Sequence, residues 1–303
     1  MTDLAGLILA HEGHELRLDT IVRWWTWSPL VIGLLLLSGT LYARGVRRLW
    51  GRLGTGGGVR KWELAAFGAG WLALWTALVS PLDRLSDILF SAHMAQHEIL
   101  MVVAAPLLVI GRPFLPMLWA LPARARDAFG EWARRPRVRH AWSWATGPFV
   151  VLALHAMAVW VWHAPVLFEA ALRSETVHGF QHLCFFWTAV LFWWSMVQGG
   201  YGRLGYGIAV LFVFATAVHT SVLGALLTFA SILWYPSYAG RSAAWGVPAL
   251  PDQQLAGLYM WIPSGLAFLV LGLALVAAWI GEAERRVALG RPELAGVAVT
   301  RDA

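Results

Sequence analysis

The sequence is poor in cysteine and in charged residues, and both shortages narrow what the chain can be. A single Cys among 303 residues excludes a disulfide framework and any metal cage built from several thiolates. Charged residues make up only 13% of the chain and hydrophobic residues 59%, whereas a soluble domain usually carries about 25% charge. So few charges cannot cover the surface of a water-soluble fold. The composition therefore indicates an integral membrane protein.

Short catalytic motifs are missing as well. The sequence has no HExxH, no GxSxG and no Walker-type loop, so we expect no enzymatic activity of the classes that these motifs serve. The net charge is +6, but the basic residues cluster in short segments between apolar runs. That distribution is typical of membrane topology, and we expect no nucleic-acid partner.

Seven stretches are apolar over about the 20 residues that a helix needs to cross the hydrocarbon core. They lie at 25–43, 63–80, 88–110, 147–163, 180–198, 207–234 and 254–280. The sixth is long enough to be tilted or to contain a break. No secretory signal is evident, so the first stretch is expected to be an uncleaved span. The sequence thus predicts an all-α, polytopic bundle of seven transmembrane helices over residues 25–280.

The basic residues predict the orientation of this bundle. When Lys and Arg are counted by alternate loops, 18 lie on one side of the membrane and 5 on the other. The rich side is cytoplasmic by the positive-inside rule. We therefore expect the N-terminus outside, with residues 1–24 as an extracytoplasmic arm, and residues 281–303 as a cytoplasmic tail. The arm contains HEGHE, which is either a solvated terminus or a metal-capturing segment.

Two loops have amphipathic patterns. Residues 122–139 are strongly basic and predict either an amphipathic helix on anionic headgroups or a solvated loop. Residues 164–180 contain a short amphipathic piece that we expect on the outer surface.

One histidine motif occurs twice, as HMAQH (His93 to His97) and HGFQH (His178 to His182). Each copy has the form H-x-x-Q-H and opens a helix that enters from outside. Because residues i and i+4 lie on one face of a helix, both imidazoles of a copy can bind one metal ion. Each copy is followed by a return helix with one deep histidine, His155 or His219. The pattern suggests a hairpin repeat over 88–163 and 178–234, with a metal site between its units.

Several of these histidines also have a structural interpretation. A single buried histidine such as His155 or His219 is explained equally by a hydrogen-bonded tie between helices. His163, which precedes Ala164 and Pro165, is explained either as a ligand or as the cap of its helix.

The donor types favour copper. Imidazole suits several transition metals, while thioether sulfur favours Cu(I). Met101 follows His97 by one turn, and we predict Met101, Glu98, Asp252 and Met260 as auxiliary ligands or as partners that orient the ligands. Cys184 points to nearly the opposite face from His182 and is a poor candidate. Haem is the alternative cofactor, because helical bundles also bind haem through paired histidines.

The segments SPLDRLSDILFSAHMAQHEILMVVAAPLLVIGRP, HGFQHLCFFWTAVLFWW and PDQQLAGLYMWIPSGL carry a family resemblance. With them the chain resembles the caa(3)-type cytochrome c oxidase assembly factors (CtaG-like) over residues 25–280. The resemblance implies a seven-helix protein of the bacterial cytoplasmic membrane that helps to mature haem–copper oxidases. It also implies His93, His97, His178 and His182 as the principal histidines, with Asp252 opening the last helix.

These observations lead to a main hypothesis and two alternatives. The chain is expected to be a non-enzymatic, copper-binding factor that helps to mature the copper centre of cytochrome c oxidase from the extracytoplasmic side. Its partners would be an oxidase subunit or a copper chaperone, besides the lipid bilayer. The alternatives are a haem-binding membrane redox protein and a copper permease.

Overall fold

A computed structural model describes residues 24–197, 205–243 and 245–288. The HEGHE segment and most of the predicted cytoplasmic tail lie outside the described residues. All regular structure within the described part is helical. The helices, in chain order, are α2 (Pro29–Leu53), α3 (Lys61–Leu78), α4 (Pro81–Ser86), α5 (Phe90–Glu98), the π-helix η2 (Ile99–Ala104), α6 (Ala105–Ile110), α7 (Phe114–Ala120), α8 (Ala123–Arg134), α9 (Pro136–Ala145), α10 (Pro148–His163), α11 (Pro165–Arg173), α12 (Glu175–Val197), α13 (Gly205–Thr228), α14 (Tyr238–Ala243) and α15 (Ala249–Ala288).

Five of these segments are long and apolar enough to cross a membrane. They are α2, the continuous run of α5, η2 and α6, then α12, α13 and α15. The bent pair α9 and α10 raises the number to six if it is counted as one span. The prediction of an all-helical membrane protein is confirmed. The sixth predicted span is a continuous helix within Gly205–Thr228 and ends before residue 229.

Seven spans were predicted, but only five or six segments in the described part are long and apolar enough to cross a membrane. There are two physical reasons for the difference. The stretch predicted at 63–80 folds as α3, but its first turn contains Lys61 and Glu63, which lower its mean hydropathy. The stretch predicted at 147–163 folds as α10, which has only 16 residues and meets α9 at an angle of 56°. Both helices exist where the sequence predicts them, but each is shorter or more polar than an independent span.

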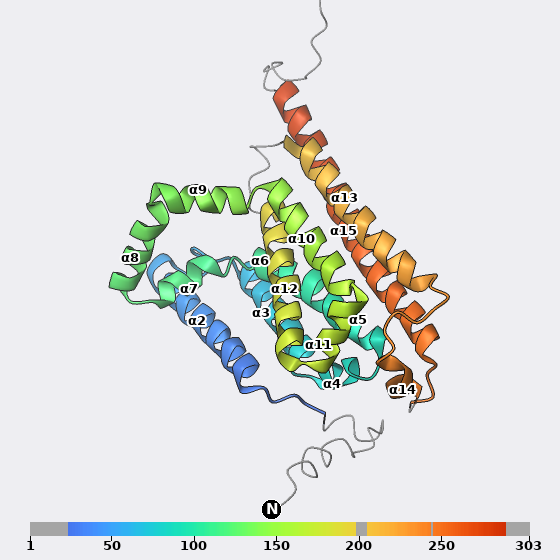
Figure 1. The fold of residues 1–303 in the computed structure, drawn as a ribbon. Helices are drawn as coiled ribbons and strands as arrows, with labels where there is room; N and C mark the ends of the chain where they lie inside the picture. The colour runs from blue at the N-terminus through green and yellow to red at the C-terminus, as the bar shows by residue number, and fades with distance from the viewer. Residues whose placement is uncertain (1–23, 198–204, 244, 289–303) are drawn as a thin grey trace, which may run out of the picture.

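The helices separate the molecule into two ends (Figure 1). The short helices α4, α11 and α14 gather at one end, beside the first turns of α5 and α12. The helices α8 and α9 lie across the other end. They have no buried residues and expose Arg124, Arg134, Arg135, Arg137 and Arg139. Of the two alternatives predicted for 122–139, the segment is helical rather than a loop, and it breaks at Arg135 because Pro136 follows it.

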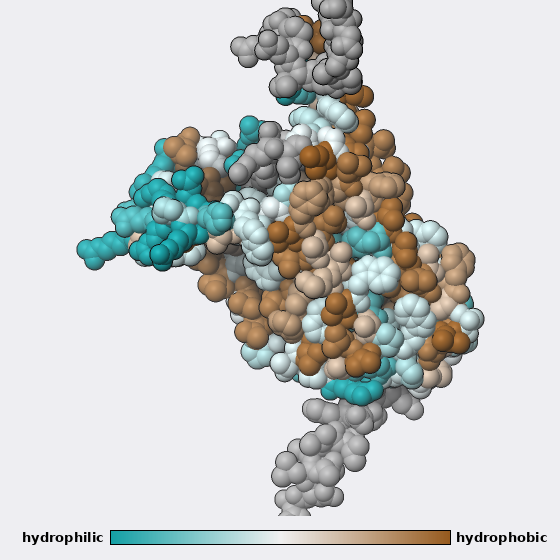
Figure 2. All heavy atoms as spheres, turned by 45° about the horizontal axis from the view of Figure 1, so that its top comes forward, coloured by the Kyte–Doolittle hydropathy of each residue, from teal (hydrophilic) through white to brown (hydrophobic). Residues whose placement is uncertain are grey.

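Large apolar side chains cover much of the outside. Leu30, Phe149, Phe214, Leu266 and Val270 are all more than half exposed, which a water-soluble surface avoids. Figure 2 shows hydrophobic residues along the α13 and α15 side, whereas hydrophilic residues gather around α8 and α9. This distribution is that of a helix bundle whose sides face lipid and whose ends face water.

Close backbone contact holds α13 against α15 (Figure 1). A Cβ atom added at Gly257 of α15 would lie 2.5 Å from the backbone nitrogen of Thr228 and 2.7 Å from the carbonyl oxygen of Gly224. Small residues of this kind let membrane helices approach closely, where van der Waals packing replaces the hydrophobic effect. Gly257 is therefore a packing position that only glycine fits without a shift of a helix.

We predict that Gly257→Ala destabilises the protein, because its methyl group meets backbone rather than a flexible side chain. The expected result is a lower thermal unfolding midpoint in detergent, with a cost of about 1–3 kcal/mol for an overpacked contact. Gly265→Ala on the same helix is the matched control, since nothing lies within 4 Å of its added Cβ. Equal midpoints for the two variants would contradict the packing role.

Candidate metal centre

Four histidines from two helices meet inside the bundle. His93 and His97 lie on α5, and His178 and His182 lie on α12. One ring nitrogen from each is within 4.8 Å of the others. The ring centroids are 4.4 Å apart for His93 and His97, 5.0 Å for His93 and His178, and 5.2 Å for His97 and His182. The two copies of the motif therefore form one cluster, here called the histidine centre.

A carboxylate from the last long helix fixes where α5 begins. Asp252 of α15 accepts hydrogen bonds from the backbone N–H groups of Phe90, at 2.6 Å, and Ser91, at 3.2 Å, and from the Ser91 hydroxyl. The first N–H groups of a helix have no partner within the helix, and Asp252 provides one from a distant part of the chain. It therefore orients the helix that carries His93 and His97. Within the described part of the chain, these hydrogen bonds of Asp252 go to Phe90 and Ser91 and not to the histidine centre.

The glutamine of each motif ties its helix to a neighbour. Gln96 donates from its side-chain amide to the carbonyl of Ala77, at 2.7 Å, and to the carboxylate of Asp83, at 2.8 Å. Gln181 donates to the carbonyl of Trp162 at 3.5 Å. Both side chains are fully buried. The glutamines thus hold α5 against α3 and α4, and α12 against α10, while the flanking histidines point at one another.

The hydrogen bonds of Tyr238 determine which nitrogen of His93 is free. The Tyr238 hydroxyl donates to the carbonyl of Ser86 at 2.9 Å and lies 3.2 Å from Nδ1 of His93. Since a hydroxyl has a single proton, Nδ1 of His93 must donate to the Tyr238 oxygen. Nε2 then carries the lone pair, and it has no hydrogen-bond partner among the described residues. An outer partner that fixes the tautomer of a ligating imidazole is a recurring feature of metal sites.

The same reasoning applies to His163, at the end of α10. Its Nδ1 lies 2.7 Å from the carbonyl oxygen of Val159, which can only accept, so Nε2 again keeps the lone pair. Nε2 of His163 has no hydrogen-bond partner within the described part of the chain. Its ring centroid is 6.2 Å from that of His97. His163 therefore lies at the side of the histidine centre, with a nitrogen free to join it.

The centre contains no carboxylate, and its histidines are largely unpaired. Nε2 of His178, Nε2 of His182 and both ring nitrogens of His97 lack partners among the described residues. His93 and His97 are fully buried, and His178 is partly buried. Buried polar atoms are normally hydrogen-bonded. A set of converging imidazole lone pairs without partners is the arrangement that a metal ion satisfies.

The other predicted site residues lie elsewhere. His155 and His219 face each other across α10 and α13, with ring centroids 6.0 Å apart. Glu98, Met101 and Met260 line a small cavity together with His155. None of the four residues of the histidine centre lines this cavity. The structure thus divides the predicted residues into two groups, and their roles as ligands stay predictions.

Short segments cover the end of the bundle that lies next to the histidine centre. The Tyr235 hydroxyl donates to the carbonyl of His163 at 2.8 Å, and Ser237 donates through its backbone and its hydroxyl to Glu169 of α11. Burial alone would raise the pKa of Glu169, but hydrogen bonds from Ser237 and Arg173 outweigh it and lower that pKa below its usual value. The predicted amphipathic piece in 164–180 is confirmed as α11, with Phe168 buried on its inner face.

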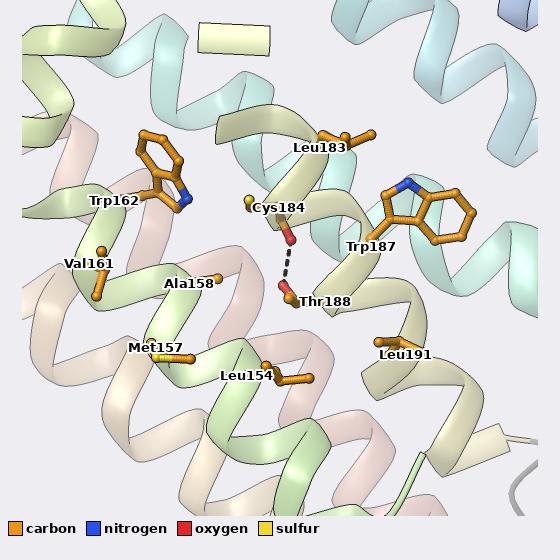
Figure 3. A pocket seen from close by; sticks show the side chains of 10 residues that line it. All are labelled: Leu154, Met157, Ala158, Val161, Trp162, Leu183, Cys184, Trp187, Thr188 and Leu191. Atoms are coloured by element: carbon orange, nitrogen blue, oxygen red, sulfur yellow. Dashed lines mark hydrogen bonds between the residues drawn. The ribbon is translucent and has the colours of Figure 1, made fainter. Parts of the chain in front are cut away.

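A hollow between two of the long helices has a different character from the histidine centre (Figure 3). It has a volume of about 380 Å³ and lies between α10 and α12, between Trp162 and Trp187. The Thr188 hydroxyl donates to the carbonyl of Cys184 at 2.8 Å within the same helix. The remaining walls are largely apolar, and none of the four histidines of the histidine centre lines this groove. Cys184 lines it, which confirms that its side chain is directed away from the centre.

Sequence reasoning missed the residues that orient the centre. Tyr238 lies 145 positions after His93, and no local pattern connects them. The glutamines were visible as the constant letter of the repeated motif, and that repetition was the available signal for their structural role. Asp252 was singled out, but as an auxiliary ligand rather than as the partner of the α5 backbone.

Comparisons with known proteins identify a family and several relatives of the chain. A family model described as "Cytochrome c oxidase caa3 assembly factor" matches residues 40–282. An uncharacterized protein of Mycobacterium leprae is 26% identical over 91% of this chain and 43% of its own length. An uncharacterized protein of Mycobacterium bovis is 28% identical over 72% of this chain and 34% of its own length. The chain thus spans less than half the length of the curated relatives it matches. No solved structure matches the chain.

We predict that Asp252→Ala lowers both the stability of the protein and its capacity to retain metal, because α5 loses the partner of its first N–H groups. Loss of a helix cap costs about 0.5–2 kcal/mol, measurable as a lower unfolding midpoint in detergent. Asp252→Asn is the matched variant, since its amide oxygen still accepts a backbone N–H, and we expect it to fall between Ala and wild type. An Asp252→Ala variant with a wild-type midpoint would exclude the capping role.

Proposed function

Because the chain belongs to the cytochrome c oxidase caa3 assembly factor family, we propose that it is a non-enzymatic, copper-binding membrane protein that helps to mature the copper centre of cytochrome c oxidase. The histidine centre carries this proposal. Its four imidazoles lie within ligand distance of one another in the interior of the bundle. Its partners would be an oxidase subunit and a copper chaperone or another copper donor, in the bacterial cytoplasmic membrane.

The charge of the centre favours Cu(I) over a divalent ion. Four neutral imidazoles provide no negative charge as ligands, and the carboxylates of Asp83 and Glu175 act on His178 only through space. The cost of burying an ion rises with the square of its charge, and buried unpaired charges are expensive. A monovalent ion therefore costs about a quarter as much as a divalent one by this argument, and imidazole is an accepted ligand of copper.

The compactness of the centre supports an ion rather than haem. Haem would place a wide macrocycle between its two axial histidines. Here the donor atoms of four histidines all lie within 4.8 Å of one another, and the Phe168 and Phe185 rings pack against them. A small ion satisfies the four donors without moving these rings.

We further propose seven membrane-embedded helices, with the N-terminus and the histidine centre toward the extracytoplasmic side. In support, the arginine-rich helices α8 and α9 lie at the end of the bundle opposite to α4, α11 and α14 (Figure 1). Basic loops are retained in the cytoplasm. The copper centre that this protein would help to mature would then be approached from the outer face.

This orientation predicts which engineered cysteines are reached from outside intact cells. In a Cys184→Ala background, Glu175→Cys at the start of α12 should react with an impermeant thiol reagent. Ser143→Cys on α9 should react only after permeabilisation. Both positions are exposed, so access rather than burial decides the result. Labelling of Ser143→Cys alone in intact cells would reverse the proposed topology.

The metal proposal predicts that His93→Ala combined with His97→Ala abolishes binding of copper at the histidine centre. The double variant removes half of the donors, so copper retained after detergent purification should fall by at least one ion per protein. His140→Ala is the control, because His140 is exposed on α9 and distant from the centre. The measurement is metal content, with the unfolding midpoint recorded to verify folding.

The same purified samples separate copper from haem. A Soret band with stoichiometric iron and little copper would favour the haem-binding alternative. Copper retention in the double variant equal to wild type would remove the histidine centre from the proposal. A copper permease would instead show uptake into sealed vesicles that depends on His93.

A further inference from the structure

A second, smaller cavity lies deeper in the bundle than the histidine centre. It has a volume of about 20 Å³, which is room for one water molecule or one ion. Six helices contribute to its walls, and seven of its residues carry oxygen, nitrogen or sulfur in their side chains. These seven are Glu98, Met101, His155, Trp193, Thr220, Met260 and Ser264. Such a concentration of heteroatoms is unusual inside a membrane bundle, where ionisable residues are expensive and mark function.

The carboxylate of Glu98 is the least satisfied group of this cavity. Glu98 is buried, and its Oε2 has no hydrogen-bond partner among the described residues. The hydroxyls of Thr220 and Ser264 donate to the carbonyls of Thr216 and Met260 in their own helices. They therefore have no proton left for Glu98, and its carboxylate oxygen stays without a partner among the described residues.

The tautomer of His155 leaves its second nitrogen available. Its Nδ1 lies 3.4 Å from the hydroxyl oxygen of Thr188, and that hydroxyl donates to the carbonyl of Cys184. The Thr188 proton is thus already used, so Nδ1 of His155 is the donor of the contact. Nε2 of His155 then carries a lone pair, as Nε2 of His93 does in the histidine centre and Nε2 of His163 does beside it.

The π-helix η2 brings Glu98 and Met101 to the cavity. It begins at Ile99, directly after Glu98, and Met101 lies within it. Its wide turns are rare and often occur at functional sites. The Trp193 indole donates to the backbone carbonyl of Met101 at 2.9 Å, which holds this turn against α12. The continuous run of α5 and η2 thus places His93 and His97 in the histidine centre (the upper centre) and Glu98 and Met101 in the small cavity (the lower cavity).

The two sites are separate. None of His93, His97, His178 and His182 lines the lower cavity. His155 precedes His163 by eight residues on α10, which corresponds to about 12 Å along a helix. The donor types differ as well, since the upper centre has imidazoles only, whereas the lower one combines thioethers, one imidazole and one carboxylate.

We propose that the lower cavity is a second metal site, which binds Cu(I) through the sulfur atoms of Met101 and Met260 and through Nε2 of His155. Thioether ligands select Cu(I) among the biological metals. The carboxylate of Glu98 balances the charge, because a monovalent cation and one carboxylate together carry no net charge. The proposal goes beyond the function proposed for the histidine centre. It implies two copper-binding sites along the continuous run of α5 and η2.

The test is a titration of the detergent-purified full chain with Cu(I) against a chelating competitor. Wild type should bind two copper ions, and Met101→Leu combined with Met260→Leu should bind one. Leu keeps the volume of Met and usually costs little stability. Met196→Leu is the matched control, because Met196 is equally buried in the core but does not line the cavity.

X-ray absorption at the copper edge identifies the ligands. His93→Ala combined with His97→Ala should retain one copper with sulfur in its coordination shell, whereas the double Met variant should retain one copper with nitrogen ligands alone. A double Met variant that binds as much copper as wild type, with the same spectrum, would overturn the second site. Loss of copper only in the double His variant would do so too, while leaving the function of the upper centre intact.

Glu98→Gln provides an independent variant if the double Met variant fails to fold. It keeps the shape of the side chain and removes the negative charge. We expect the affinity of the lower site for Cu(I) to fall at least tenfold, with the upper site unchanged. An unchanged affinity at both sites would exclude charge balance by Glu98.

Discussion

The requirement that polar groups inside a membrane bundle find partners governs this structure. Among the described residues, twelve buried side-chain nitrogen and oxygen atoms have no hydrogen-bond partner, and eight of them are ring nitrogens of histidine. Elsewhere polar side chains are engaged, as when Tyr42 donates to the carbonyl of Gly111 and Trp71 to that of Leu35. The unsatisfied atoms are therefore concentrated where lone pairs converge. Because an unpaired polar atom costs free energy, this concentration supports the proposal that a metal ion binds at the histidine centre.

The positions of the helices follow from the sequence, because hydrophobic length and loop charge are local properties. The bend between α9 and α10 and the shortness of α10 were less predictable. At 16 residues the helix is about 24 Å long, which is less than a bilayer requires. It reaches its place because α12 packs beside it and Gln181 holds the carbonyl of Trp162. Hydropathy alone reports neither of these contacts.

The histidine centre could be predicted from the sequence to a similar extent. The spacing of His93 and His97, and of His178 and His182, places each pair on one face of its helix. Only the fold brings the two faces together. The role of Asp252 was out of reach, because its partners are backbone N–H groups more than 160 residues earlier in the chain. The separation of Met101 from the histidines was equally hidden, since the sequence does not reveal that α5 continues as a π-helix.

The division of the donors into two sites has a consequence for how a metal ion would move. In the proposed histidine centre, a copper ion would have only neutral imidazoles as ligands. In the proposed lower cavity, the same ion would meet a carboxylate and two thioethers, which match Cu(I) in charge and in softness. Under the two-site proposal, an ion that reached the histidine centre would therefore bind more favourably in the lower cavity. A filled lower cavity would then leave the histidine centre as the site that exchanges copper with a partner.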